Sequence, residues 1–549
     1  MVRSMLSLLL IAGAAVAAEQ PGAMPLASKI ARFAPTEVMA DMSKLAPGEK
    51  AALDKILQAA KLMDDIYLRQ VWSKNVETLA RLSAGEAPET ADLVRYFRLN
   101  VGPWSRIDEG QSFVPGISEK KPAGANFYLE DMTRDEFEKW VATLPEAERK
   151  KATGFFHVVR RTPDGKLTLV PYSKEYQEFL EPAARLLREA AGLTGNETLK
   201  IYLLKSADSF ASNDYFESDI AWMDLDAPIE PTIGPYEVYE DELFGYKAAF
   251  EAFVTLRDDA ETAKLARFSS QMQELEDHLP IDAKYRNPKL GSGSPIRVVD
   301  EVFVAGDANH GVQTAAFNLP NDERVVALKG SKRVMLKNVQ QAKFDKVLMP
   351  IARVVLDAKS LAAVKFDPFF THILAHELVH GIGPHNITVD GMPTTVREQL
   401  KELGSAVEEA KADITGLWAL GHLGKKGVVG PEVLDGMYTT FLASMFRSVR
   451  FGITEAHGKG VALLFNWLRD RGAITYDEKG TKFAIVDAKI QDAVAKLSGE
   501  LMTLEAEGSY QKTKAMLDRY GVVRPEMKHA LDKLGAVPVD IAPSFPAVR

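Results

Sequence analysis

Cysteine is absent from this 549-residue chain. Its absence excludes disulfide bonds, thiol catalysis, cysteine-ligated metals and a lipid-modified cysteine behind a secretion signal. An excess of basic residues is lacking as well, because 67 lysines and arginines stand against 76 aspartates and glutamates, for a formal net charge of -9. A chain with this balance has no basic surface for nucleic acid, so we expect no nucleic-acid partner.

Long apolar runs are lacking beyond the N-terminus. Residues 5–17 form an apolar run rich in leucine and alanine, which Arg3 precedes and Ala15-Val16-Ala17 ends. These features are typical of a secretory signal, whereas a bilayer span needs about 20 apolar residues. We expect residues 1–18 to be a signal peptide. The mature protein is then expected to be periplasmic or secreted, without stable membrane association.

Hydrophobic spacing predicts a mixed first part and a helical second part. Residues 39–84 have apolar side chains at helical spacing, and residues 155–172 are typical of a hairpin. The further expected elements are strands near 200–204 and 236–238, a helical stretch over 246–278, and strands at 297–305, 312–318 and 333–338. From residue 344 the pattern is helical, apart from a hairpin near 474–486.

The expected fold class is α+β, because strand-rich and helix-rich segments are separated along the chain. A chain of 549 residues is longer than a typical domain, so we expect more than one hydrophobic core. We expect a mixed lobe over residues 19–254, to which 298–345 returns, and a mainly helical lobe over 255–549 that carries the catalytic site.

The central motif is His376-Glu377-Leu378-Val379-His380. Two histidines four residues apart share one face of a helix, so both can reach one metal ion. We expect Asp367 to cap this helix, and glycine and proline end it just after His380. Glu377 lies beside the first ligand, where it can act on a water molecule as a general base.

A catalytic zinc site needs a third protein donor. The candidate is Glu409, on a helix expected over residues 405–420 that returns antiparallel to the first. Glu409 and Asp413 share a face, so one carboxylate can bind zinc while another accepts a hydrogen bond from a ligand histidine. Alternatives remain: the histidines could lie on a solvated face, Glu408 could form a capping box with Ser405, and Asp413 could be a surface charge.

These residues resemble the dipeptidyl-peptidase III family of zinc exopeptidases. The blocks that carry the resemblance, in the family's order, are Ile233 to Tyr239, Leu243 to Gly245, Phe250 to Val254, Phe317 to Asn321, Lys337 to Val339, Glu408 to Asp413 with Gly416-Leu417, and Glu455 to His457. The resemblance implies two lobes around a wide cleft, a helical zinc lobe and a lobe with a β-barrel-like sheet. It also implies one Zn2+ per chain and an oligopeptide substrate.

The resemblance further implies individual roles. By this resemblance Glu409 is the third ligand, and Glu408 and Asp413 contact the ligand residues rather than the metal. His457 stabilises the oxyanion from across the cleft. The residues implied to hold the substrate's free N-terminus are Glu230, Asn318 and Asn321. The chain departs from the family in two places. It has one residue fewer between Glu377 and His380, and it has Thr232 where the family has a tyrosine.

The expected function is therefore that of a zinc-dependent peptidase that releases dipeptides from the free N-terminus of oligopeptides. Two alternatives stay open: a zinc hydrolase of another amide substrate, and a periplasmic peptide-binding protein with a residual metal site. Glu377 argues against binding alone, because binding needs no general base.

Export predicts a processed N-terminus. Cleavage after Ala17 or Ala18 leaves a mature chain that begins at Ala18 or Glu19. The intact mass of the protein from its native host measures this, and a cytoplasmic chain that keeps Met1 would contradict it.

Overall fold

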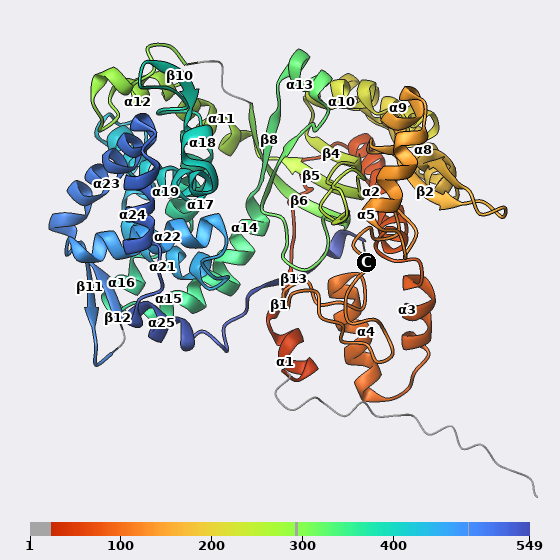
Figure 1. The fold of residues 1–549 in the computed structure, drawn as a ribbon, viewed down its shortest axis with the longest axis horizontal. Helices are drawn as coiled ribbons and strands as arrows, with labels where there is room; N and C mark the ends of the chain where they lie inside the picture. The colour runs from red at the N-terminus through yellow and green to blue at the C-terminus, as the bar shows by residue number, and fades with distance from the viewer. Residues whose placement is uncertain (1–23, 291–294, 481, 549) are drawn as a thin grey trace, which may run out of the picture.

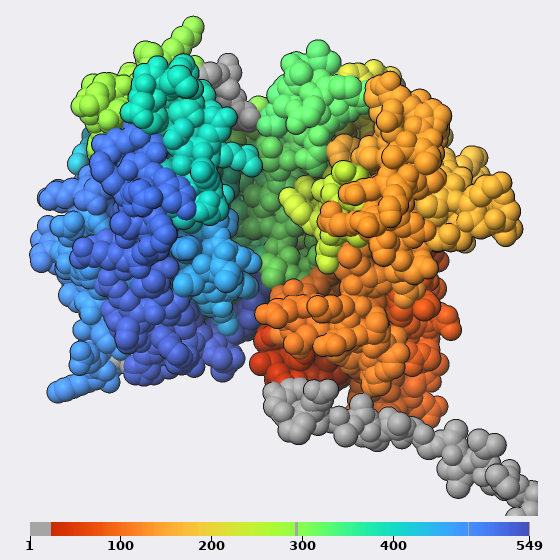
Figure 2. Space-filling model, in the orientation of Figure 1, coloured from red at the N-terminus to blue at the C-terminus, as the bar shows by residue number. Residues whose placement is uncertain are grey.

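A computed structural model describes residues 24–290, 295–480 and 482–548. The expected signal peptide, residues 1–18, lies outside the described residues. Figure 1 shows two bodies side by side, a helical one in teal and blue and a mixed one in red to green. Figure 2 shows a hollow between them. Within the described ranges, no helix is both long and apolar enough to cross a bilayer.

The mixed body holds the described elements of the first part of the chain. Its helices are α1 (Leu26–Ala31), α2 (Pro47–Val71), α3 (Asn75–Ser83), α4 (Pro88–Asn100), α5 (Arg134–Thr143), α6 (Glu146–Ala152), α7 (Tyr172–Glu175), α8 (Gln177–Leu193), α9 (Glu197–Ser212), α10 (Phe216–Met223), α13 (Glu323–Lys329) and α14 (Lys337–Lys343). The hairpin β2 (His157–Arg161) and β3 (Leu167–Pro171) confirms the expected one.

A five-stranded sheet forms the centre of this body. Its strands are β4 (Ile229–Pro235), β5 (Phe250–Arg257), β6 (Ile296–Gly306), β7 (Ala316–Leu319) and β8 (Lys332–Leu336). Their order is β4-β5-β6-β8-β7, in which only β6 and β8 run parallel. The sheet is open, with β4 and β7 at its edges, so the expectation of a barrel-like sheet was wrong. Nothing pairs β4 with β7 to close it among the described strands.

The helical body contains the segment from His376 to His380. Its helices are α11 (Asp259–Ser269), α12 (Met272–Asp277), α15 (Met349–Val355), α16 (Ala358–Ala362), α17 (Phe366–Val379), α18 (Val396–Leu400), α19 (Gly404–Lys425), α20 (Pro431–Leu434), α21 (Met437–Val449), α22 (Ala456–Asp470), α23 (Asp487–Glu507), α24 (Tyr510–Tyr520) and α25 (Pro525–Asp532). Two hairpins accompany them, β9 (Asn386–Val389) with β10 (Met392–Thr395), and β11 (Ile474–Asp477) with β12 (Lys482–Ile485).

The end of the chain returns to the mixed body. Strand β13 (Asp540–Ser544) pairs in parallel with β1 (Phe33–Glu37). Asp540 is buried there and forms an ion pair of 2.9 Å with Lys343, which is equally buried on α14. A buried charge needs such a partner, so this pair holds the C-terminal strand in place.

Several expected elements were wrong, and each has a local reason. Residues 200–204 lie inside α9, whose start is marked by Asn196, because its side chain accepts from the Leu199 N–H at 2.9 Å. Residues 250–253 belong to β5 rather than to a helix. This strand is central and buried on both faces, so it lacks the alternating pattern of an exposed strand. The expected strand at 236–238 is loop, because β4 ends at Pro235.

Two further differences concern helix boundaries and a missed hairpin. The expected helix over 39–84 is two helices, α2 and α3, separated at Trp72, whose backbone is extended. The β9–β10 hairpin was not predicted, although Asp390-Gly391 sits at its turn with positive φ at both residues. Such a dipeptide between apolar residues is a strong hairpin signal.

A shared apolar core joins the two bodies at the sheet. Ile296, Val298 and Met335, from β6 and β8, pack in one cluster with Phe370 and Leu374 of α17. Helix α17 therefore packs directly against β6 and β8.

Candidate metal centre

Helix α17 carries the two motif histidines. It begins at Phe366, and Lys365 precedes it without a side-chain cap, so the expected capping by Asp367 was wrong. Asp367 instead lies in the first turn, where a negative charge suits the helix dipole. The helix buries Phe369, Phe370 and Val379, because it packs on several sides.

Helix α19 runs antiparallel to α17 at close distance. A Cβ atom placed on Gly416 would lie 3.2 Å from the backbone nitrogen of His376, which is tighter than most real contacts. Ala410 and Ala412 are fully buried on the same helix. The missing side chain at Gly416 therefore lets the two backbones approach far enough for the side chains of α19 to reach the histidines.

Three donor atoms from the two helices face one point. His376 Nε2 lies 3.1 Å from His380 Nε2 and 3.3 Å from Glu409 Oε2. His380 Nε2 lies 4.0 Å from the same Glu409 oxygen. This group is one of those in the described chain that could hold a metal ion.

Two donor separations, 3.1 and 3.3 Å, are close to those expected around zinc, and the third, 4.0 Å, is longer. Donors of a tetrahedral zinc with bonds of about 2.0–2.2 Å lie roughly 3.3–3.6 Å apart. The Glu409 Oε2 atom is buried and receives no well-formed hydrogen bond. Its neighbours are two ring nitrogens, His457 Nδ1 at 3.0 Å and His376 Nε2 at 3.3 Å, and a cation between the three donors would complete its surroundings.

The other ring nitrogen of each histidine faces a second carboxylate. Asp413 Oδ1 lies 2.8 Å from His376 Nδ1, and Glu408 Oε1 lies 2.7 Å from His380 Nδ1. The buried Lys411 Nζ contacts the same Glu408 oxygen at 2.8 Å. With Nδ1–H donating to a carboxylate, each ring keeps Nε2 free for a metal.

The site favours positive charge strongly. Burial disfavours the imidazolium of His376, yet Asp413 and Glu409 raise its pKa to about 10. Burial also opposes ionisation of Glu409, but the imidazoles of His376 and His457 lower the pKa of this carboxyl. A divalent cation can replace the proton that this arrangement stabilises, and metal binding then releases that proton.

Glu377 points toward the sheet and remains accessible. Its side chain is 28% exposed, and Oε2 lies 3.3 Å from Arg333 Nη1 of β8. The same guanidinium nitrogen donates to the Glu377 backbone carbonyl at 2.8 Å. Arg333 therefore holds both the last turn of α17 and the carboxylate of the candidate base.

His457 lies beside the donors rather than across the cleft, so its expected position was wrong, whereas its expected role in stabilising an oxyanion stays a prediction. It sits in the first turn of α22, in the helical body, and its Nδ1 lies 3.0 Å from Glu409 Oε2. The side chain is largely exposed. His372 is buried with its Nε2 2.8 Å from the Asp413 carbonyl, which is a structural contact.

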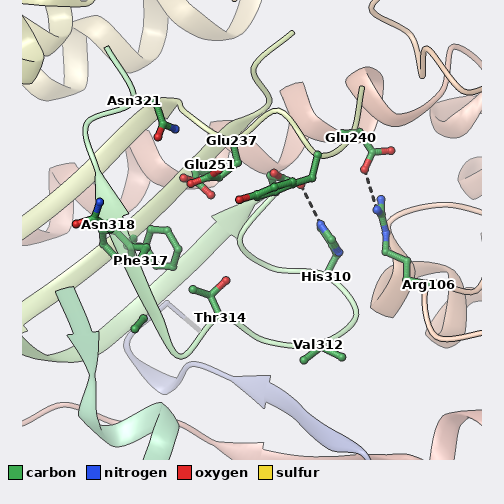
Figure 3. Close-up of a pocket in the computed structure, with 14 residues that line it drawn as sticks. Arg106, Glu237, Glu240, Glu251, His310, Val312, Thr314, Phe317, Asn318 and Asn321 are labelled. Atoms are coloured by element: carbon green, nitrogen blue, oxygen red, sulfur yellow. Dashed lines mark hydrogen bonds and ion pairs between the residues drawn. The ribbon is translucent and has the colours of Figure 1, made fainter. Parts of the chain in front are cut away.

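Asn318 and Asn321 lie together on the mixed body. Both line a cavity of about 460 Å³, where they are exposed at and just after β7 (Figure 3). Asn321 donates to the Tyr236 carbonyl at 3.0 Å. Asn318 pairs across the sheet with Arg333, so this cavity and the candidate base are linked through neighbouring strands.

The structure does not bring Glu230 to this cavity. Glu230 is 5% exposed and lies 3.4 Å from Arg297 Nε and 3.6 Å from Arg257 Nη1. Burial raises the pKa of its carboxyl, which these cations oppose. Thr232 is also buried, and its Oγ1 accepts from the Trp222 indole N–H at 2.9 Å. Neither side chain is among those that line the cavity.

Sequence reasoning missed Lys411 and Arg333. Lys411 had a local signal, because it follows Glu408 by one helical turn within a recognised block. Arg333 had none, since its contact with Glu377 depends on how the sheet packs on α17.

A family model and two solved structures indicate one family. The profile of Peptidase family M49 matches residues 116–385. A dipeptidyl-peptidase III structure from Caldithrix abyssi is 48% identical, with a TM-score of 0.90 over 94% of this chain and 98% of that chain. One from Corallococcus sp. strain EGB is 55% identical, with a TM-score of 0.77 over 95% and 97%.

A plant protein is also similar over most of its length. It is 42% identical across 95% of this chain and 74% of the plant protein, which comes from Arabidopsis thaliana and is named Nudix hydrolase 3. Fold, donor set and matches together define a metallopeptidase. The chain belongs to the dipeptidyl-peptidase III family, peptidase family M49.

Metal content and turnover should separate the roles at this centre. Glu409→Ala should lose most zinc, because one of three protein donors is gone. Glu377→Ala should keep zinc and lose nearly all turnover, because only the base is removed. Asp413→Ala should cost roughly 10–100-fold in affinity or activity. Elemental analysis beside peptidase assays measures all three, and an active Glu377→Ala enzyme would remove this base from the mechanism.

Arg333 should act by positioning Glu377. Arg333→Ala should keep zinc and KM but lower kcat by roughly 10–100-fold, since a displaced base loses its geometry. Added guanidinium should restore part of the rate. Arg324→Ala, on exposed α13, is the matched control and should leave kcat unchanged. An unaltered kcat in Arg333→Ala would show that the contact only supports the fold.

Proposed function

We propose that this protein is a zinc-dependent dipeptidyl peptidase that acts on the free N-terminus of oligopeptides. The observation that carries the proposal is the convergence of His376, His380 and Glu409 beside an accessible carboxylate, Glu377. We also propose export, from the pattern of residues 1–18.

The residues of this chain divide the reaction between them. When bound, zinc supplies Lewis-acid chemistry, polarising a peptide carbonyl and making water acidic. Glu377 takes a proton from the attacking water and passes it to the leaving amine nitrogen as the C–N bond breaks. Asp413 and Glu408 hold the histidines in the tautomer and orientation that the metal requires.

The proposal includes one zinc ion per chain. Two other groups of described residues could hold an ion: Glu274 with His278 and His422, and Glu240 with Asp307 and His310. Cations already occupy both, because Lys426 contacts Glu274, while Arg106 and Lys121 each approach Glu240 at 2.7 Å. Competing protein cations weaken metal binding at these two places.

The sheet edge offers a place for the peptide chain. β7 pairs with β8 on one side, and its other side pairs with no strand in the described part of the chain. An extended peptide can add to such an edge through main-chain hydrogen bonds. A peptide on β7 reaches Asn318 and Asn321, whose amide oxygens can accept from an ammonium group.

An anchored N-terminus determines which bond is cut. If the ammonium is held at the cavity, the distance to Glu377 and the metal is set by the number of extended residues between them. The second peptide bond is then the one presented, and dipeptides are released.

A pair of short peptides tests this specificity. The peptide with a free N-terminus should lose a dipeptide, and the N-acetylated one should be cut much more slowly, because a charge-assisted hydrogen bond is roughly twice as strong as a neutral one. Mass spectrometry of the products, with and without a chelator, measures both. Equal cleavage of the two peptides, or internal cuts in long ones, would identify an endopeptidase.

A further inference from the structure

The loop between β6 and β7, residues 307–315, forms one wall of the cavity beside β7. Val312 and Thr314 of this loop line the cavity, as Figure 3 shows. Gln313 stands between them in the chain, but it is buried and is not among the residues that line the cavity. Because the three residues share one stretch of backbone, the point at which Gln313 is held also determines where Val312 and Thr314 stand.

A buried ion pair holds both backbone polar groups of Gln313. Its N–H group donates to Asp540 Oδ2 at 2.8 Å. The Lys343 ammonium group donates to its carbonyl oxygen, and the same ammonium lies 2.9 Å from Asp540 Oδ2. Lys343 and Asp540 are both buried. The two charged side chains therefore bind each other and the backbone of one loop residue at the same time.

Neutral hydrogen bonds hold the loop on either side of Gln313. Gly311 donates its N–H group to the Leu99 carbonyl at 2.7 Å, and Gln340 Nε2 donates to the Ala315 carbonyl at 2.9 Å. Hydrogen bonds with an ionised partner are roughly twice as strong as neutral ones. The ion pair thus adds charge-assisted contacts at the residue that separates the two cavity-lining side chains.

Asp540 belongs to a C-terminal strap, residues 537–545, that contacts both bodies. At the start of the strap, Arg450 of α21 donates to the carbonyls of Val537 and Pro538 at 2.9 and 2.7 Å. The strand β13 within the strap then pairs with β1 of the mixed body. The carboxylate that holds the cavity wall is therefore carried by a segment that the helical body also holds.

We propose that Asp540 and Lys343 are positioning residues of the cavity beside β7, which act through the backbone of Gln313 on Val312 and Thr314. Neither charged side chain is among those that line the cavity. Their role is preorganisation, because a wall that is held in advance does not have to be ordered when a peptide binds. This inference rests on the proposed peptidase function, which places the substrate's N-terminus in this cavity.

The double variant Asp540→Leu with Lys343→Met tests this role in the zinc-loaded enzyme. An apolar pair in place of a buried ion pair often leaves the fold as stable, so the variant separates position from folding. It should raise KM for tetraalanine about 3- to 10-fold, because the wall must then be ordered on binding. Its kcat and zinc content should stay unchanged, and Tm verifies that it is folded.

A milder variant covers the case in which the double variant does not fold. Asp540→Asn keeps an acceptor for the Gln313 N–H group but loses the charge. It should raise KM about 2- to 3-fold, again with kcat unchanged. A folded Asp540→Asn enzyme with the KM of the wild type would then contradict the inference.

Phe545→Leu is the matched control for a loosened strap. The Phe545 ring packs edge-on against Phe303 of β6 with ring centroids 5.6 Å apart. Shortening this side chain should lower Tm, because buried contacts are lost, while KM stays unchanged. If Phe545→Leu raises KM as much as the double variant does at an equal loss of Tm, the ion pair only supports the fold and the inference is overturned.

Hydrogen exchange reports on the loop itself. The amides of residues 307–315 should exchange faster in the double variant than in the wild type, because the Gln313 backbone has lost both partners. Mass spectrometry of peptic fragments that contain the loop measures this, and Phe545→Leu should leave the exchange of the loop unchanged. Exchange at the wild-type rate in the double variant would overturn the inference.

Binding without turnover separates the inference from the proposed function. Calorimetry with tetraalanine uses zinc-loaded Glu377→Ala, alone and combined with the double change, which should raise Kd about 3- to 10-fold. Dipeptide release by the wild-type enzyme, with an unchanged Kd in the folded combined variant, would overturn the inference and keep the proposed function. A raised Kd without any dipeptide release by the wild-type enzyme would overturn the proposed function and keep the inference.

Discussion

The close packing of α17 on α19 is the constraint on which the rest of the centre depends. The donors come from two helices that are joined by a hairpin and a short helix, so only their mutual distance brings His376, His380 and Glu409 together. Gly416 keeps that distance short. A larger side chain at this position would separate the backbones, and the carboxylates of α19 would no longer reach the imidazoles.

The same packing also determines which charged side chains of the centre face one another. Isolated buried carboxylates would be costly, but Asp413 and Glu408 each face a histidine, and Lys411 adds a cation at Glu408. The donors that remain for a metal are Glu409 Oε2 and the two histidine Nε2 atoms, which lie 3.1 Å from each other. This arrangement is typical of a site that a bound cation completes.

The two bodies contribute different chemistry across one hollow. The helical body supplies the donors and the base, while the sheet supplies an unpaired edge and an acidic cavity. Arg333 connects them, because it lies on β8 opposite Asn318 and contacts Glu377. Since the sheet packs on α17 through a shared apolar core, the peptide edge and the base keep a defined relation.

Some of the fold was predictable from local pattern. Helical spacing indicated α17 and α19, and the turn residues Pro163-Asp164-Gly165 indicated the β2–β3 hairpin. The central strand β5 was not predictable in this way, since burial on both faces removes the alternation that marks a strand. The open sheet could not be seen either, because closure depends on pairing between distant strands.

For the site, the amino-acid sequence by itself determined the chemistry of the metal centre. The spacing of His376 and His380 on one helix requires that both face the same side, whatever surrounds them. Tertiary structure decided everything that depends on distance between separate segments. It placed His457 beside Glu409 and Glu230 between two arginines. Carboxylates that are identical in sequence acquire different roles because burial and neighbouring charge are properties of the folded chain.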